Sequence, residues 1–272
     1  MKLGVSYNLF DGEELLEGSI KQIRNQVDYI SVVYQKVSNF GNPCNEELIP
    51  LLNRLKEEGL IDELFEYKPK LTETFNTIGL RIIEGNGHFN EIIKRNVGLS
   101  LSVGAKCTHH MSMDSDEYYL PEQFKFLKEE MINGDYDSSY CQMKTYYKSW
   151  EYQLDPPEDY YVSLIYKINR YSLFEMGKYS PVLVDPTRRM DSGKHRIFNR
   201  EEIEMHHGSY VRNNVRIKLE NSSASINFKN DITKIVEHYN NWEYPNKVLW
   251  GGLPSTLHNV KKIKNLFDYE NK

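Results

Sequence analysis

The sequence predicts an α/β protein with a mostly parallel sheet flanked by helices and with a helical C-terminal part. Strand-type and helix-type patterns alternate through the first 120 residues, which is the order that crossover helices give to a parallel sheet. Hydrophobic residues make up 39% and aromatic residues 12% of the 272 residues, enough to build the core of one large domain. No apolar run reaches the roughly 18 residues that a membrane span needs.

The alternation begins with a strand over residues 2–10, followed by a helix within residues 11–30. Apolar residues recur at helical spacing there, and Asp11 followed by Glu14 predicts a capping box at the helix start. The next elements are a strand over 29–35, a helix over 45–59, a strand over 64–69, a helix over 88–105 and a strand over 107–116. Sheets of this kind bind ligands at the carboxyl ends of their strands, so we expect the functional site there.

The pattern is looser beyond residue 120. Residues 140–154 and 159–169 have β character, and residues 185–200 form a polar, basic loop. Helical signals run from residue 209 onward and are clearest over 231–242. We expect one compact domain over residues 1–210, with a helical extension over 211–272 packed on it.

Charge and cysteine content exclude several classes of protein. The net charge of −5 argues against general nucleic-acid binding. Cys44, Cys107 and Cys141 are odd in number and far apart, so they indicate neither a disulfide framework nor a CxxC metal site. The N-terminal segment becomes acidic too quickly for a signal peptide. These features predict a cytoplasmic protein.

Two carboxylates mark the end of the fourth predicted strand. Asp114 and Asp116 are spaced i, i+2, and such residues on a strand point the same way. Oxygen ligands in this arrangement suit Mg²⁺ or Mn²⁺ that also holds phosphate oxygens. The alternative interpretation is an ordinary turn, because Asp and Ser favour turns.

Two motifs resemble those of a known family. "KRNVG", with Arg95, Asn96 and Gly98, resembles the R-N-x-G that precedes the metal motif in family 2-like glycosyltransferases of the GT-A fold. "MDSDEYY" resembles the D-x-D-E-Y-Y of bacterial and viral surface-glycan glycosyltransferases. The resemblance covers about residues 1–120. It implies a GT-A (Rossmann-like) catalytic domain over residues 1–210, in which 1–120 bind the nucleotide sugar and 121–210 the acceptor.

The resemblance also implies a set of metal ligands. Asp116 would bind Mn²⁺ or Mg²⁺ directly, while Asp114 would hold the ribose or the metal. A histidine from the C-terminal half often completes the shell, and "EMHHGSYVR" offers His206 and His207. Neighbouring residues on a strand point to opposite faces, so one of the two is expected to bind, and we favour His207. The alternative is that both are surface or helix-cap residues.

The donor nucleotide needs a base pocket and cations for its phosphates. A tyrosine face and amide side chains at the ends of the first two strands can stack on and read a pyrimidine. Arginine and lysine on a loop can clamp a diphosphate. The candidates for donor binding are Ser6, Tyr7, Asn8, Gln35, Ser38, Arg95, Asn96, Asp114, Arg188, Arg189, Lys194, Arg196 and Arg212. The alternatives are strand-end capping for the first group and a solvated loop for the cations.

An inverting enzyme also needs a carboxylate base near the acceptor hydroxyl, whereas a retaining enzyme does not. "DPPEDYY" offers Glu158 and Asp159, similar to the acidic pair of family 2 enzymes, and Asp155, Asp185 and Asp191 compete with them.

Together these features predict metal-dependent transfer of a sugar from a nucleoside diphosphate sugar, with UDP expected, to a hydroxyl of a glycan or lipid-linked glycan. Surface polysaccharide or lipopolysaccharide synthesis is the pathway that the resemblance implies, with peripheral contact at the inner face of the cytoplasmic membrane. The alternatives are a nucleotidyltransferase acting on sugar phosphates and a non-catalytic glycan-binding protein on the same fold. A nucleotidyltransferase would need a glycine-rich loop after the first strand, where only Gly12 occurs.

Overall fold

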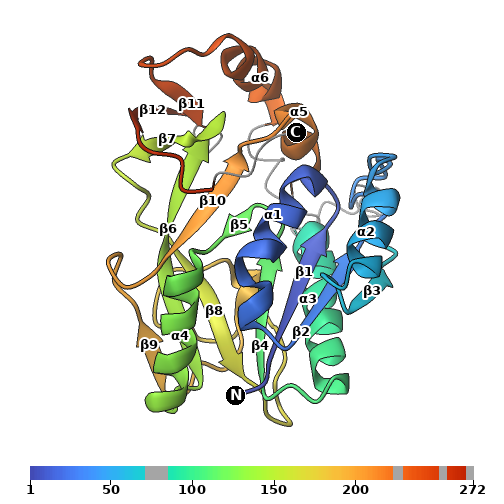
Figure 1. Cartoon of the computed structure of the whole chain (residues 1–272). Coiled ribbons are helices and arrows are strands. Elements are labelled where there is room, and N and C mark those ends of the chain that lie inside the picture. The colour runs from blue at the N-terminus through green and yellow to red at the C-terminus, as the bar shows by residue number, and fades with distance from the viewer. Residues whose placement is uncertain (71–84, 223–228, 251–255, 268–272) are drawn as a thin grey trace.

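The computed structural model describes residues 1–70, 85–222, 229–250 and 256–267. Its centre is one long sheet in the order β11-β12-β7-β6-β8-β4-β1-β2-β3, with helices packed against it (Figure 1). The predicted α/β class, with a parallel sheet flanked by helices, is confirmed.

The N-terminal half of the sheet is parallel throughout. It consists of β1 (Leu3–Leu9), β2 (Tyr29–Tyr34), β3 (Glu63–Glu66) and β4 (His109–Asp114). Every residue of β1 is buried, as expected for a strand covered on both faces. In the register of β1 and β4, Asn8 lies opposite Asp114, so both reach the same carboxyl edge.

Helices cover the two faces of this parallel sheet. Tyr7 donates or accepts a hydrogen bond with Ser19 of α1 (Glu13–Ile23), while its neighbour Ser6 lies against Gly98 of α3 (Gly85–Gly104). Because successive strand residues point to opposite faces, α1 and α3 lie on opposite sides of β1. The helix α2 (Leu48–Glu57) packs beside α1, and Gly59 follows its end with φ +74°.

The second half of the sheet is mixed. β8 (Tyr161–Lys167) joins β4 in antiparallel orientation, followed by β6 (Ser138–Tyr147) and β7 (Ser149–Asp155). Three short or late strands complete this half: β5 (Glu117–Tyr118), β9 (His195–Ile197) and β10 (Glu204–Tyr210). β10 runs parallel to β6 and antiparallel to β5, which brings residues 204–210 to the end of β4.

Several elements differ from the sequence prediction. The helix α4 (Pro121–Asn133) was not predicted, although Phe124, Leu127 and Met131 are buried at helical spacing behind an N-terminal proline. The capping box at α1 is wrong: Gly12 at φ +74° precedes the helix with no side-chain cap. Asp11 instead pairs with Arg212 Nη1 at 3.3 Å, because the C-terminal part of the chain reaches this loop.

The C-terminal part contains the expected helices and an unexpected hairpin. α5 (Val215–Asn221) and α6 (Ile232–Asn241) follow β10, and a short helix η6 (Lys229–Asp231) leads into α6. β11 (Val248–Trp250) and β12 (Thr256–Lys262) then extend the sheet beyond β7. Two further short helices lie elsewhere, η1 (Arg24–Gln26) and η4 (Pro186–Arg188).

A separate apolar cluster anchors the C-terminal helices. It joins Tyr147 and Leu154 of the sheet to Leu219 of α5 and Ile235 of α6. This packing fixes α5 beyond the carboxyl edge of the parallel strands (Figure 1). Among the described residues, no helix combines the length and apolar character that crossing a bilayer requires.

Candidate functional site

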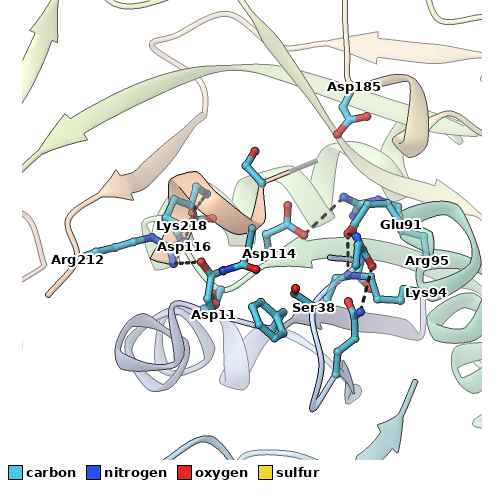
Figure 2. Close-up of a pocket in the computed structure, with 17 residues that line it drawn as sticks. Asp11, Ser38, Glu91, Lys94, Arg95, Asp114, Asp116, Asp185, Arg212 and Lys218 are labelled. Carbon is cyan, nitrogen blue, oxygen red and sulfur yellow. Dashed lines mark hydrogen bonds and ion pairs between the residues drawn. The ribbon is translucent and has the colours of Figure 1, made fainter. Parts of the chain in front are cut away.

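A polar cavity of about 200 Å³ lies at the carboxyl ends of β1, β2 and β4 (Figure 2). The residues that line it are Asn8, Phe10, Asp11, Gln35, Ser38, Asn39, Glu91, Lys94, Arg95, Asp114, Ser115, Asp116, Asp185, Arg212, Lys218, Asn221 and Ser222. They come from both halves of the chain, so the cavity exists only in the folded protein. Its place at the carboxyl edge of parallel strands is where sheets of this class bind ligands.

The Asp116 carboxylate is buried and held by two cations. Arg212 Nη2 donates to Asp116 Oδ2 at 2.6 Å, and Lys218 Nζ donates to the same oxygen at 2.9 Å. Burial alone would raise the pKa of Asp116, but Lys218 and Arg212 outweigh it and hold that pKa well below its usual range. Asp116 is therefore ionised at neutral pH.

Asp114 is held by a different pair of cations. Arg188 Nη2 donates to Asp114 Oδ2 at 2.6 Å, and Arg95 Nη2 lies 3.5 Å from Asp114 Oδ1. Burial opposes ionisation, yet Arg188 and Arg95 lower the pKa of Asp114 to about 2. Arg188 Nη1 also donates to the buried Glu117 at 3.1 Å. Burial outweighs the opposing effect of Arg188 and, together with the nearby Asp114 charge, raises the pKa of Glu117 to about 7.

The motif residues on α3 have separate structural roles. Arg95 donates to Ser112 Oγ at 2.7 Å and to Thr187 Oγ1 at 3.3 Å, so it ties α3 to β4 and η4. Asn96 lies outside the cavity; it donates to Phe174 O at 3.0 Å and accepts from Phe174 N at 2.8 Å. Asn96 therefore fixes a loop here, although donor binding was predicted for it.

Part of the predicted base pocket lines the cavity. Asn8, Gln35 and Ser38 are all there, and Asn8 is only 7% exposed. Neither the amide nitrogen nor the amide oxygen of Asn8 has a hydrogen-bond partner within the described part of the chain. A buried amide without partners is costly, which points to a ligand that satisfies it.

The other two predicted base-pocket residues point elsewhere. Tyr7 is fully buried in the core, and its hydroxyl lies 3.0 Å from Ser19 Oγ, so its face does not reach the cavity. Ser6 is fully buried beneath Gly98 of α3. Strand alternation turns Tyr7 to the face opposite Asn8. Ser6 shares the face of Asn8 but lies two residues earlier in β1, where Gly98 of α3 covers it.

The two histidines lie on opposite faces of β10. His207 Nε2 is 3.8 Å from Asp116 Oδ2, and burial lowers the pKa of His207 to about 4, so its imidazole is neutral at neutral pH. His206 is 2% exposed, and its Nδ1 lies 2.7 Å from the Tyr146 hydroxyl. The structure thus places His207 next to Asp116, whereas His206 lies in an aromatic cluster.

The predicted basic loop reaches the site through only one of its cations. Arg188 contacts Asp114, as described above. Arg189 Nη2 donates to Val184 O at 3.4 Å, and Lys194 Nζ donates to Gly134 O at 2.6 Å. Arg196 pairs with Glu202 at 2.5 Å. Arg189 and Lys194 are therefore held by backbone oxygens and Arg196 by a loop carboxylate. The three side chains do not form the diphosphate clamp that was predicted.

Of the predicted carboxylate bases Asp185, Asp159 and Glu158, one lines the cavity and two do not. Asp185 lines the cavity and accepts hydrogen bonds from Thr187 N and Oγ1, both at 2.8 Å. Asp159 accepts from Gln142 Nε2 at 2.8 Å and is exposed. Glu158 accepts from Thr145 Oγ1. Neither of the last two lines the cavity.

The sequence analysis missed several residues that line the cavity. Lys94 is 3% exposed and pairs with Glu91 at 2.8 Å. Lys218 comes from α5, six positions after Arg212, and Asp11 comes from the loop before α1. The adjacency of Lys94 to Arg95 was a usable signal, whereas Lys218 and Asp11 reach the site only through tertiary contacts.

The donor set fits a divalent cation that is bound together with phosphate. The described residues contain no group of three or more His, Cys, Asp or Glu side chains that could hold a metal by themselves. However, Asp116 Oδ2 and the neutral His207 imidazole face each other across 3.8 Å. Carboxylate oxygen and imidazole nitrogen are ligands of Mn²⁺, and Mg²⁺ in particular is usually held by few protein ligands plus phosphate oxygens.

Comparison with known proteins gives structural neighbours only. No family model and no curated protein matches the sequence. S. aureus TarS 1–349 aligns over 88% of this chain and 71% of its own, at 12% identity and a TM-score of 0.47. GalNAc-T7 with UDP, GalNAc and Mn²⁺ aligns over 90% of this chain and 50% of its own, at 12% identity and a TM-score of 0.47.

A further neighbour, S. aureus TarS 1–349 in complex with UDP-GlcNAc, aligns over 53% of this chain at 18% identity and a TM-score of 0.36. That alignment spans 35% of the TarS chain. These neighbours are GT-A glycosyltransferases. With TM-scores below 0.5, these likenesses assign no activity to this chain.

Proposed function

We propose that this protein transfers a glycosyl group from a nucleoside diphosphate sugar, with a UDP-sugar as the expected donor, to a hydroxyl of a glycan acceptor. One observation carries the proposal. Asp114, Asp116 and the unpartnered amide of Asn8 converge on one polar cavity at the carboxyl ends of β1 and β4. The cavity therefore offers an amide for a base edge beside two carboxylates suited to a metal-bound diphosphate.

The amide end of the cavity suits a pyrimidine. Asn8 offers both a donor and an acceptor, and a uracil edge presents the complementary pair. Gln35 is 1% exposed and donates to Asn39 Oδ1 at 3.1 Å, which fixes its side chain at the rim of β2. These groups hold the base in a defined orientation.

The charged end of the cavity suits a diphosphate only with additional positive charge. Lys94, Arg95, Arg212 and Lys218 each already have a carboxylate partner. A diphosphate adds at least two negative charges, so a divalent cation between Asp116 and His207 would complete the balance. When bound there, the ion would stabilise the charge of the departing nucleoside diphosphate.

The protein's own side chains then have distinct tasks. The Lys218 ammonium group donates one hydrogen bond to Asp116 and has further N–H donors for a phosphate oxygen. Its side chain is 24% exposed, so a ligand can reach these donors. In the transfer, the acceptor oxygen bonds to the sugar C1 as the C1–O bond to phosphate breaks and its electron pair leaves with the diphosphate. In an inverting reaction, the hydroxyl proton would pass to a carboxylate, and Asp185 is the predicted base that faces the cavity.

Space for the rest of the ligands lies beside the cavity. A second cavity of about 850 Å³ shares Phe10, Asp11, Arg212 and Asn221 with the first and extends over the start of α2. Its volume is in the range of sites for small organic ligands. The proposed acceptor is a glycan in the synthesis of a surface polysaccharide or lipopolysaccharide. The proposed place of the reaction is the cytoplasm, with contact at the membrane if the acceptor is lipid-linked.

Calorimetric titration tests the proposal. UDP, GDP, CDP and dTDP are each titrated with Mn²⁺ and with EDTA into wild type, Asp116→Asn and the control Asp135→Asn. Asp135 is an exposed carboxylate, 82% accessible and outside the cavity. We expect UDP to bind with Mn²⁺, Asp116→Asn to lose this binding, and the control to keep it. Absence of binding by every nucleotide in wild type would overturn the proposal.

A further inference from the structure

We propose that Glu158 is a positioning residue that acts through Thr145 on His207. The Glu158–Thr145 pair holds the His207 imidazole with its proton on Nδ1, which leaves Nε2 bare and directed toward Asp116. The contacts themselves do not depend on the reaction. The consequence for metal binding rests on the proposed function.

Strand register brings the three side chains together. Thr145 lies on β6 and His207 lies directly opposite it on the parallel strand β10. Thr145 is fully buried, and its Oγ1 lies 3.4 Å from His207 Nδ1. On its other side, Thr145 Oγ1 donates to Glu158 Oε2 from the segment after β7. The contacts thus lead from Glu158 through Thr145 and His207 to Asp116, which lines the cavity.

Counting protons in this line determines the tautomer. A threonine hydroxyl has one hydrogen and two lone pairs, and a carboxylate only accepts. Since Thr145 gives its hydrogen to Glu158, it can only accept from His207, so Nδ1 must carry the proton. A neutral imidazole has one N–H, so the lone pair is on Nε2, 3.8 Å from Asp116 Oδ2.

A bare nitrogen beside Asp116 supplies an imidazole ligand for a cation bound at that carboxylate. In this tautomer Nε2 cannot donate to Asp116 Oδ2, 3.8 Å away, and that oxygen already accepts from Arg212 and Lys218. Second-shell groups that fix the tautomer of a histidine ligand typically change metal affinity by about 10–100-fold. Glu158 therefore contributes to the site without lining the cavity, which differs from the base role expected from the sequence.

His206 provides a matched comparison on the next position of β10. Its Nδ1 lies 2.7 Å from the hydroxyl of Tyr146, the neighbour of Thr145 on β6. Its ring stacks on Tyr146, with centroids 5.8 Å apart, and packs edge-on against Phe267. Here a hydroxyl also meets Nδ1, but the histidine lies among aromatic rings. Removal of the Tyr146 hydroxyl therefore serves as the control.

The experiment measures the tautomer first. Long-range ¹H–¹⁵N correlation spectra of the metal-free full chain at pH 8 report which nitrogen of His207 carries the proton. We expect the Nδ1–H form in wild type, and a mixture of tautomers in Thr145→Val and Glu158→Leu. Thr145→Ser and Glu158→Gln should keep the Nδ1–H form, because serine retains the hydroxyl and glutamine retains an acceptor oxygen. An Nε2–H form in wild type would overturn the inference whether or not nucleotides bind.

The second measurement is the affinity for Mn²⁺ in the presence of UDP. We expect Thr145→Val to weaken it about 10–100-fold, and Thr145→Ser and Tyr146→Phe to leave it within about threefold. An unchanged affinity in a folded Thr145→Val protein would refute the positioning role, while the proposed function would stand. If wild type shows the Nδ1–H form but binds Mn²⁺ with none of UDP, GDP, CDP and dTDP, the proposed function fails, and the predicted effect on metal affinity fails with it.

Discussion

Replacement of Gly98 by alanine tests how tightly α3 packs on the sheet. A Cβ at this position would lie 2.5 Å from Ser6 Cβ, a distance that real side chains do not reach. Ser6 is on β1, which is fully buried, so neither the strand nor its short side chain has room to yield. α3 would have to move away from β1.

The expected change in the free energy of unfolding combines two opposing effects. Alanine inside a helix is favoured over glycine by about 1 kcal/mol. Overpacking of a tight interface costs typically 1–3 kcal/mol. We expect a net loss of up to about 2 kcal/mol, measured by denaturant unfolding. UDP affinity should fall as well, because Arg95 lies one turn earlier on the same helix.

Gly104→Ala is the matched control on the same helix. A Cβ there would meet nothing within 4 Å, and the residue has no positive φ, so we expect a gain of up to about 1 kcal/mol. The packing argument would be refuted if Gly98→Ala were as stable as Gly104→Ala. In a double-mutant cycle, Ser6→Gly should reduce the loss caused by Gly98→Ala, since it removes the colliding atoms.

Three further outcomes are expected. Asn96→Ala removes both hydrogen bonds to the Phe174 backbone and should lower the free energy of unfolding by about 1–3 kcal/mol in denaturant unfolding. Little change would show that other contacts hold this loop. Glu117 has a pKa raised from 4.5 to about 7, so the folded state retains a proton that the unfolded chain releases. The free energy of unfolding of the wild type should therefore fall between pH 4.5 and 7, by on the order of 1–3 kcal/mol more than that of Glu117→Gln. Parallel pH profiles of the two proteins would contradict this. Asn8→Leu should weaken UDP binding at least tenfold in calorimetry without loss of stability, whereas unchanged affinity would remove the base-reading role.

The sequence predicted well what short-range patterns encode. Alternation of strands and helices gave the parallel half of the sheet, and the position of Asp114 at the end of β4 followed from it. α4 was missed although its apolar spacing was visible. It begins at Pro121, directly after the motif residues, and its buried Phe124, Leu127 and Met131 have the spacing of an amphipathic helix.

Contacts between distant strands could not be predicted in the same way. The parallel pairing of β10 with β6 places His207 beside Thr145, yet the residues are 62 positions apart. Likewise Lys218 reaches Asp116 across 102 positions, because an aromatic and aliphatic cluster fixes α5 over the sheet edge. Such partners depend on the complete fold, whereas a motif describes only neighbours in the chain.

The two like charges at the end of β4 are compatible because each has its own cations. Asp114 faces Arg95 and Arg188, while Asp116 faces Arg212 and Lys218 from the C-terminal part. Removal of one partner from a buried ion pair costs about 3–5 kcal/mol, since the remaining charge stays buried without compensation. Asp116→Asn should therefore lower stability as well as nucleotide binding.

Lys218→Gln separates those two effects. Asp116 keeps its 2.6 Å bond to Arg212, and Lys218 is partly exposed, so we expect a stability change below about 1 kcal/mol. The affinity for UDP with Mn²⁺ should still fall about tenfold, because the positive charge near the phosphates is lost and the glutamine amide is a neutral donor. Thermal unfolding and calorimetry on the same protein sample measure both quantities. A stable Lys218→Gln protein with wild-type affinity would show that Lys218 only neutralises Asp116, and a large loss of stability would place its role in holding α5 on the sheet.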